Sequence, residues 1–163
     1  MSIKVLIIFC FFNFFLLNET LPDEFFIDGD VIYISDSAQK YVMDVINSYM
    51  NTPYRYGGTT KSGIDCSGFV KAVYYSVGIN IPRTSMKQSK IGCNVKRNKL
   101  QFIDLIFFAT RGNRVNHVGL YIQDGIFVHS ARKVGVTFDS LHKKYYKKRY
   151  LFSKRIFINW KHG

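Results

Sequence analysis

The sequence has few of the residues that would define a domain held together by disulfides or metal ions. Among its 163 residues there are only three cysteines, three prolines and one tryptophan. It contains no C-x-x-C or H-E-x-x-H motif, so neither a structural zinc site nor a zinc-protease motif is indicated. It also has no repeat or heptad pattern, which argues against an array or a filament. With 47% hydrophobic and 17% aromatic residues, the chain is expected to fold as one globular domain.

A long hydrophobic run is also missing. The longest apolar stretch, residues 5–17, has 13 residues and is interrupted by Asn13. It is too short to span a bilayer comfortably, and it follows residues 1–4, which carry one positive charge, as in a secretory signal peptide. We therefore predict a signal peptide over residues 1–19, although no A-x-A-like cleavage motif follows. A short membrane anchor or an apolar strand is the alternative, and Cys10 is interpreted as part of the apolar run.

Acidic residues are scarce outside the N-terminal region. Six of the eleven acids precede residue 37, whereas 22 of the 23 lysines and arginines follow it. A domain with this charge balance attracts polyanions in a salt-dependent way. For an exported protein we expect a polyanionic envelope surface as the partner and no nucleic acid. The chain is accordingly divided into an acidic linker or arm (residues 20–36) and a basic domain (residues 37–163), with a solvated loop at residues 143–149.

Helical patterns come before strand patterns in this domain. A first helix is expected from Ser35 or Ser37 to about Met50, a second from near Asp65 to Gly78, and a short third over residues 85–91. Apolar or alternating runs then predict strands at residues 104–108, 117–122, 126–131, 134–138 and 155–160. Helices followed by strands predict an α+β fold, with N-terminal helices packed on an antiparallel β-sheet.

Cys66 lies at the predicted start of the second helix. A thiol in the first helical turn meets free N–H groups and the positive end of the helix dipole, which favour the thiolate. Backbone N–H groups there can also bind an oxyanion. The position therefore suits the nucleophile of covalent catalysis. A disulfide with Cys93 is the alternative in an oxidising compartment.

His117 and His129 lie in two predicted strands joined by a short turn. A three-residue turn over residues 123–125 would pair Gly119 with His129 and place both histidines on one face as diagonal neighbours. A two-residue turn would place them on opposite faces. We predict the three-residue turn, because it also buries the apolar residues of both strands on the other face. Gly119 would then leave open space for an approaching substrate.

Five segments, taken in order, resemble the motifs of the NlpC-type cell-wall peptidase family. They are P-Y-R-Y-G-G at residues 53–58, D-C-S-G-F-V at 65–70, I-P-R-T-S at 81–85 followed by Gln88, H-V-G-L-Y at 117–121 and F-V-H-S at 127–130. The resemblance spans roughly residues 37–160 and implies a papain-like cysteine peptidase fold. One position departs from the family pattern. Ile103 stands where the family has the glycine of a Pro-Gly-Asp turn, so we expect a differently built corner.

The resemblance also implies roles for individual residues. Cys66 would be the nucleophile, His117 the general base and His129 the polar group that orients it. Substrate contacts would come from the hydroxyl of a tyrosine beside the thiol, from the two residues that flank the cysteine and from an arginine of the cleft: Tyr54, Asp65, Ser67 and Arg83. Asp65 has an alternative role as a helix N-cap, and Arg83 an alternative place on the surface.

The expected function is hydrolysis of an amide in peptidoglycan stem peptides, at the bond between the D-glutamate side chain and a diamino acid. The resemblance implies no cofactor, and it implies a location in the periplasm, the cell wall or outside the cell. Related amidases and acyl-transfer enzymes make those reactions alternatives. Two other classes remain open. One is a metal site of Cys66, His117, His129 and a carboxylate, and the other is a basic protein that binds nucleic acid or a cell-envelope polyanion.

Overall fold

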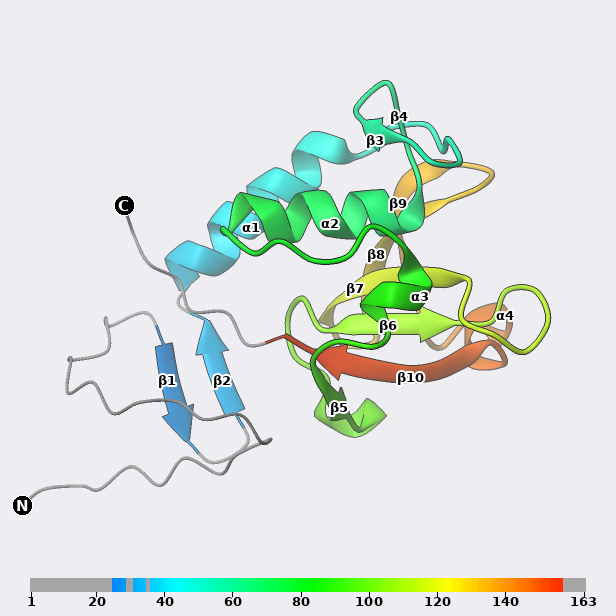
Figure 1. Ribbon diagram of the computed structural model, residues 1–163. Coiled ribbons are helices and arrows are strands. Elements are labelled where there is room, and N and C mark those ends of the chain that lie inside the picture. Colours follow the sequence, from blue (N-terminus) through cyan, green and yellow to red (C-terminus); the bar gives the residue numbers. More distant parts are fainter. Residues whose placement is uncertain (1–24, 29–30, 35, 157–163) are drawn as a thin grey trace, which may run out of the picture.

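The computed structural model describes residues 25–28, 31–34 and 36–156 (Figure 1). Its helices are α1 (Asp36–Tyr49), α2 (Cys66–Ser76), α3 (Ser85–Gln88) and α4 (Lys144–Lys147), with a 3-10 helix η1 (Arg97–Lys99). The main sheet contains β5 (Cys93–Val95), β6 (Leu105–Phe108), β7 (His117–Gln123), β8 (Ile126–Ala131), β9 (Gly135–Ser140) and β10 (Tyr150–Arg155). Two small hairpins pair β1 (Phe25–Asp28) with β2 (Val31–Ile34), and β3 (Thr59–Thr60) with β4 (Gly63–Ile64).

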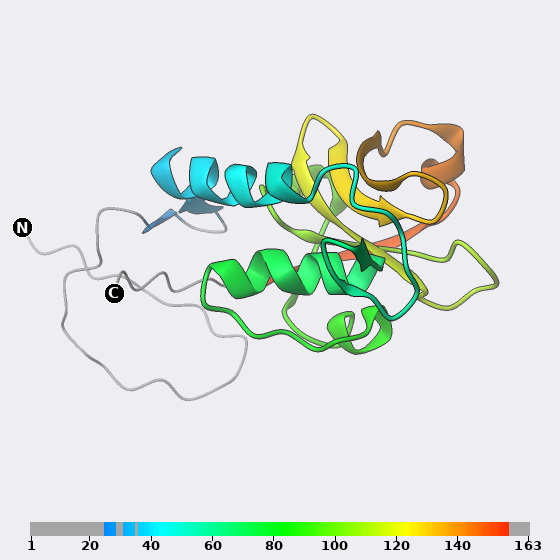
Figure 2. The ribbon, with the colours of Figure 1, turned by 90° about the horizontal axis from the view of Figure 1, so that it is seen from above.

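The six strands form one antiparallel sheet in the order β5-β10-β6-β7-β8-β9. Helices α1 and α2 lie side by side on one side of this sheet (Figure 2). The predicted α+β fold, with N-terminal helices on an antiparallel sheet, is confirmed. β10 is the last described strand in chain order, yet it lies between β5 and β6.

Several predicted boundaries are wrong. Helix α1 includes Ser37, which therefore cannot be its N-cap. The basic run at residues 143–149 is not a plain loop, because it contains α4 with the buried Tyr146. The last strand follows at Tyr150–Arg155, earlier than the predicted residues 155–160. Ser35 and the predicted signal peptide lie outside the described residues. Within the described part of the chain, no helix is long and apolar enough to cross a membrane.

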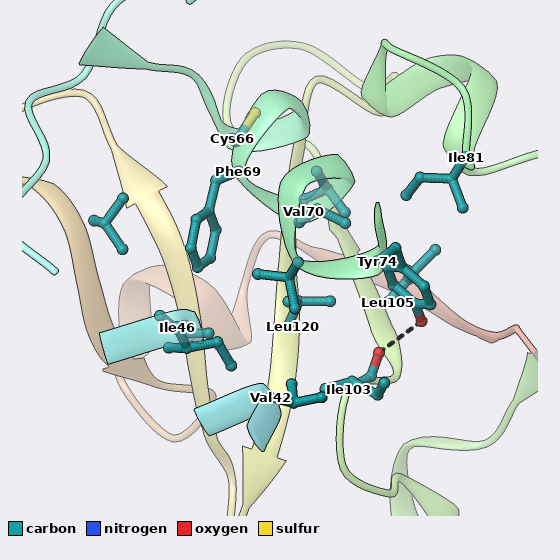
Figure 3. Close-up of a cluster of buried hydrophobic side chains, with 14 of the residues drawn as sticks. Val42, Ile46, Cys66, Phe69, Val70, Tyr74, Ile81, Ile103, Leu105 and Leu120 are labelled. Atoms are coloured by element: carbon teal, nitrogen blue, oxygen red, sulfur yellow. Dashed lines mark hydrogen bonds between the residues drawn. The ribbon is translucent and has the colours of Figure 1, made fainter. Parts of the chain in front are cut away.

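The main core lies between the helices and the sheet (Figure 3). Strand β6 is buried on both faces: Leu105 and Phe107 point into this core, whereas Ile106 and Phe108 join a second cluster on the other face. Burial on both faces explains why this strand is an uninterrupted apolar run in the sequence. Fully burying each such side chain stabilises the fold by about 1.5–3 kcal/mol. The main core includes Val42, Ile46, Phe69, Val70, Val73, Tyr74, Val118, Leu120 and Val128.

The corner before β6 places a branched side chain in a conformation that glycine favours. Ile103 has a φ of 60°, in the left-handed region. Two hydrogen bonds hold it: the Tyr74 hydroxyl donates to its carbonyl at 2.9 Å (Figure 3), and its N–H donates to the Tyr121 carbonyl at 2.7 Å. Burial of its side chain and these bonds offset a backbone strain of about 1–3 kcal/mol.

This strain predicts an inverted order of stability for two substitutions. Ile103→Ala and Ile103→Gly both remove the buried side chain, but only glycine also relieves the left-handed backbone. We expect the free energy of unfolding of Ile103→Gly to exceed that of Ile103→Ala by about 1 kcal/mol, opposite to the usual preference. Urea unfolding of both variants measures the difference. An alanine variant more stable than the glycine variant would contradict the strain argument.

A buried ion pair links the same corner to β10. Arg155 donates to Asp104 through Nε and one terminal nitrogen, both at 2.8 Å. The N–H of Gln101 also donates to this carboxylate, at 2.8 Å. Burial raises the pKa of Asp104, and the Arg155 hydrogen bonds lower it only in part. The carboxylate therefore depends on Arg155 to remain charged inside the protein.

Candidate active site

Cys66 is the first residue of α2, and Asp65 is its N-cap. The Asp65 backbone is extended, and its side chain accepts a hydrogen bond from the Gly68 N–H at 2.7 Å. The predicted capping role of Asp65 is therefore confirmed. The Cys66 sulfur lies at the end of the helix and points away from Phe69 (Figure 3). Cys66 and Cys93 are not joined to each other, so the alternative disulfide is not formed.

The helix start does not make Cys66 a thiolate in the resting protein. Burial raises the pKa of its thiol to about 11, although hydrogen bonds from the backbone N–H groups of Val118, Ser67 and Cys66 act in the opposite direction. The prediction of a favoured thiolate is therefore wrong for this state, because desolvation outweighs the helix terminus. The same N–H groups remain available to an oxyanion that forms beside the sulfur.

This pKa predicts slow alkylation of Cys66 at neutral pH without substrate. Because the thiolate is the reactive form, the labelling rate of Cys66 by iodoacetamide should rise by roughly tenfold per pH unit between pH 7 and 10. Peptide mapping by mass spectrometry separates Cys66 from Cys93, and a Cys66→Ala variant identifies the labelled peptide. A labelling rate that levels off below pH 7 would show an activated thiol and contradict the prediction.

The hairpin of β7 and β8 brings the two histidines into contact. His117 Nε2 lies 2.7 Å from His129 Nδ1. The turn has two residues, Asp124 and Gly125, with φ values of 50° and 77°, so the predicted three-residue turn is wrong. A bulge at Ile122 shifts the register by one residue, after which the strands pair as predicted. The prediction that both imidazoles share one face is confirmed.

Gly119 does not open a path for substrate. A side-chain atom added there would lie 2.8 Å from the Phe127 ring and 2.9 Å from the Val128 carbonyl oxygen. The Phe127 ring therefore fills the space that the sequence suggested was open. The Phe127 and His129 rings pack with centroids 4.9 Å apart, so the glycine serves packing behind the histidines.

Both imidazoles are buried and neutral in the resting protein. Burial, then the neighbouring His129 and Arg132, lower the pKa of His117 to about 3. Burial also lowers the pKa of His129, and Asp139 offsets part of that effect. Because Nε2 of His117 is engaged by His129, Nδ1 is the nitrogen left for the thiol. The backbone N–H of Val118, the residue next to His117, hydrogen-bonds the Cys66 thiol.

Tyr54 lies near the thiol, together with an arginine that the sequence did not indicate. A β-bridge to Ile64 positions Tyr54 next to the start of α2. Burial raises the pKa of its hydroxyl, and the charge that Cys66 carries once ionised and the Asp65 carboxylate raise it further, while Arg132 lowers it. The exposed Arg132 guanidinium lies 5.7 Å from the Tyr54 ring centroid. The two side chains thus place a hydroxyl and a positive charge at the edge of the site.

The other three predicted substrate residues form one cluster. Arg83 donates to both oxygens of Asp65 at 2.8 Å and to the Ser67 hydroxyl at 3.0 Å. The Ser67 hydroxyl also donates to Asp65 at 3.1 Å, and the Gly57 N–H donates to it at 2.9 Å. Burial raises the pKa of Asp65, but the Arg83 and backbone hydrogen bonds lower it below its ordinary value. Arg83 is therefore held by Asp65 rather than free on the surface, and the substrate contacts of these residues stay predictions.

Two residues behind His129 were missed by the sequence analysis. His129 Nε2 lies 3.3 Å from the Tyr146 hydroxyl and 3.8 Å from an Asp139 oxygen. The alternation that paired the histidines could have found Asp139, because β9 pairs Thr137 with His129 and Asp139 lies two residues further on the same face. The predicted strand ended at residue 138. Tyr146 gave no signal inside its basic run.

The alternative metal site finds no support in the structure. Within residues 36–156, no group of three histidine, cysteine or acidic side chains is arranged to hold a metal ion. The Cys66 thiol is instead contacted by the backbone N–H of Val118, and the adjacent His117 contacts His129.

Comparisons with known proteins show which proteins this chain is similar to. The model of the NlpC/P60 family matches residues 51–155. A murein DD-endopeptidase MepS/murein LD-carboxypeptidase from Escherichia coli is 39% identical over 71% of this chain and 61% of its own length. A gamma-D-glutamyl-L-lysine dipeptidyl-peptidase from Bacillus cereus is 46% identical over 55% of this chain and 28% of its own length.

The fold is also that of solved structures. A crystal structure of an NlpC/P60 family protein from Bacillus cereus matches with a TM-score of 0.68 and 35% identity, over 77% of this chain and 44% of that one. The chain thus spans less than two thirds of each of these relatives. The family match covers most of the described chain and includes the cysteine, both histidines and the cluster around Asp65. The chain belongs to the NlpC/P60 family.

Proposed function

We propose that this protein is a cysteine endopeptidase that hydrolyses an amide bond in peptidoglycan stem peptides. The observation that carries the proposal is the 2.7 Å contact between His117 and His129 beside a free cysteine at a helix start. This arrangement supplies a nucleophile, a base and an orienting group. The printed names of the relatives, which are murein and gamma-D-glutamyl peptidases, support the substrate class.

The proposed mechanism uses neutral groups at rest. As Cys66 Sγ attacks the amide carbonyl, its proton passes to Nδ1 of His117. The tetrahedral oxyanion accepts hydrogen bonds from backbone N–H groups at the start of α2, with the Tyr54 hydroxyl nearby. The C–N bond then breaks, and His117 gives its proton to the leaving amine. Water attacks the remaining thioester with His117 as base, which releases the acid and restores the thiol.

The proposed bond joins the D-glutamate side chain to a diamino acid. A relative named for the gamma-D-glutamyl-L-lysine bond supports this choice. A DD cross-link is the second candidate, because another relative is named a DD-endopeptidase. An open pocket of about 330 Å³ adjoins the Asp65 cluster and would hold one end of the stem peptide. Its lining residues are Arg55, Tyr56, Gly57, Gly58, Thr59, Thr60 and Gly63.

The location and organisation are part of the proposal. A peptidoglycan substrate requires export, which fits a signal peptide at residues 1–19, an acidic linker or arm at residues 20–36 and a catalytic domain at residues 37–163. The mature protein would act in the periplasm or the cell wall. Its net charge of +12 favours contact with a polyanionic envelope surface.

Defined substrates test the proposed bond. The purified protein is incubated with a stem peptide that contains the D-glutamyl–diamino acid bond and, separately, with a DD-cross-linked dimer, and product masses identify the cleaved bond. Cleavage of the first substrate alone supports the proposal. Cleavage of the dimer alone would mean that the DD cross-link, and not the D-glutamyl–diamino acid bond, is hydrolysed. Salt-sensitive binding of either substrate without products, equally in the protein and in Cys66→Ala, would indicate the binding protein considered above.

A further inference from the structure

The two nitrogens of His129 face different partners. Nδ1 lies 2.7 Å from His117, and Nε2 faces the Tyr146 hydroxyl and the Asp139 carboxylate at 3.3 and 3.8 Å. His129 is 1% exposed, so no alternative partner comes from bulk solvent. Because a neutral imidazole carries one N–H, the group that faces Nε2 decides which nitrogen of His129 is protonated.

The tautomer of His129 in turn determines the tautomer of His117. If Nε2 of His129 is protonated, Nδ1 accepts and His117 must donate from its own Nε2. Nδ1 of His117 then has a free electron pair for the thiol proton. In the opposite tautomer His129 donates to His117, and Nδ1 of His117 carries a proton that it can only offer to the sulfur. Only the first arrangement gives a base.

Asp139 and Tyr146 differ in how they influence this choice. An ionised carboxylate only accepts hydrogen bonds, so it requires a proton on the nitrogen that it faces. The Tyr146 hydroxyl can donate or accept, and on its own it would permit either tautomer. The Tyr146 hydroxyl also lies near the Asp139 carboxylate, which as an acceptor draws the hydroxyl proton towards itself. The hydroxyl oxygen is then free to accept from Nε2 of His129.

We propose that Asp139 is a positioning residue that selects the productive tautomers of His129 and His117, with Tyr146 as its intermediary. Asp139 faces a complete set of donors: His129, Tyr146, the Ser140 N–H at 2.8 Å, and Lys143, whose Nζ lies 2.7 Å from the other carboxylate oxygen. Although burial raises its pKa, these hydrogen bonds lower it below the ordinary value, so the carboxylate stays ionised. The inference rests on the proposed function only where turnover is measured.

Imidazole ¹⁵N NMR of the full chain tests the tautomers without substrate. The proposal requires Nδ1 of both histidines to be unprotonated and Nε2 of both to be protonated near neutral pH. In Asp139→Asn the amide and Tyr146 can both donate to Nε2, so a fraction of each histidine should change to the opposite tautomer. The opposite tautomer in the parent protein would overturn the proposal directly, even if Asp139→Asn did not fold.

Turnover supplies the second readout. An amide in place of an acid that contacts the base directly costs roughly 10⁴-fold in kcat. Asp139 acts through a second imidazole, so we expect a loss of roughly 10–100-fold in kcat for Asp139→Asn, with KM nearly unchanged. Normal kcat with unchanged tautomers in the folded variant would overturn the proposal. If Asp139→Asn changes the tautomers but the parent protein cleaves neither peptide, the proposal for Asp139 stands and the proposed function is rejected.

Two variants serve as controls. Asp124→Asn removes the same charge from the exposed turn, where asparagine tolerates the left-handed φ of 50°. Lys143→Met removes the ion pair and leaves the carboxylate in place. Both should keep the tautomers of the parent. Tyr146→Phe removes the intermediary but leaves the carboxylate facing Nε2, so it should change the tautomers less than Asp139→Asn does. A tautomer change in Asp124→Asn as large as in Asp139→Asn would mean that net charge, and not the contact, is responsible.

Discussion

Cys66→Ala should lose nearly all stem-peptide cleavage, because it removes the proposed nucleophile. His117→Ala should lose almost as much, since it removes the proposed acceptor of the thiol proton. Losses of roughly 10⁴–10⁶-fold in kcat are typical when a nucleophile or its base is removed. His129→Asn should keep measurable turnover through its polar side chain, whereas His129→Ala leaves His117 without a partner. Product formation measured by mass spectrometry gives all four rates.

The combination of these changes is the control. Residues that act as one unit are not additive, so Cys66→Ala combined with His129→Ala should be no slower than Cys66→Ala alone. Circular dichroism confirms that each variant is folded. Near-normal rates for His117→Ala together with an inactive His129→Asn would mean that the two histidines have been assigned in the wrong order.

Arg155→Met should reduce the free energy of unfolding by about 3–5 kcal/mol at pH 7, because it leaves Asp104 as a buried charge without its partner. Arg155 and Asp104 side chains are only 12% and 2% exposed, so water cannot replace the guanidinium. The total stability of a domain is about 5–15 kcal/mol, which makes this loss large. Denaturant unfolding of the parent and the variant measures it.

The pH dependence identifies the cause of that loss. Without Arg155 the folded-state pKa of Asp104 should rise further above its unfolded value. The cost of the charge then grows as the pH rises through the interval between the two pKa values, and disappears as the pH falls towards the unfolded value of about 3.9. The destabilisation should therefore be smaller at pH 4.5 than at pH 7. Asp104→Asn/Arg155→Met has no buried charge, and it should be more stable than Arg155→Met at pH 7.

The sequence predicted the hairpin of the two histidines for a reason that was only half right. Period-two alternation fixed which residues share a face, and this constraint survives in the structure. The turn itself has two residues, and the bulge at Ile122 corrects the register. The bulge could not be recognised in the sequence. It shifts the hydrophobic alternation by one residue, and the segment is too short to show this shift.

Effects that depend on burial were beyond the sequence. The helix start at Cys66 was visible, but the extent to which Val118 and the sheet exclude water was not, so the direction of the thiol pKa was predicted wrongly. Tyr146 was hidden for a related reason. Five of its six nearest neighbours in sequence are charged, yet α4 buries this one side chain against Phe108 and Phe127. Only the packed sheet shows which tyrosine of the run faces inward.

The position of β10 determines when the main sheet can be completed. Among the described strands, β5 pairs only with β10, and β6 lacks its second neighbour until β10 arrives. On a ribosome the sheet thus cannot close before residues 150–155 are available. Such pairing between distant segments slows folding. The chain would therefore complete the support of His117 only after Cys66 and both histidines have long emerged, so a partly synthesised molecule would lack the proposed activity.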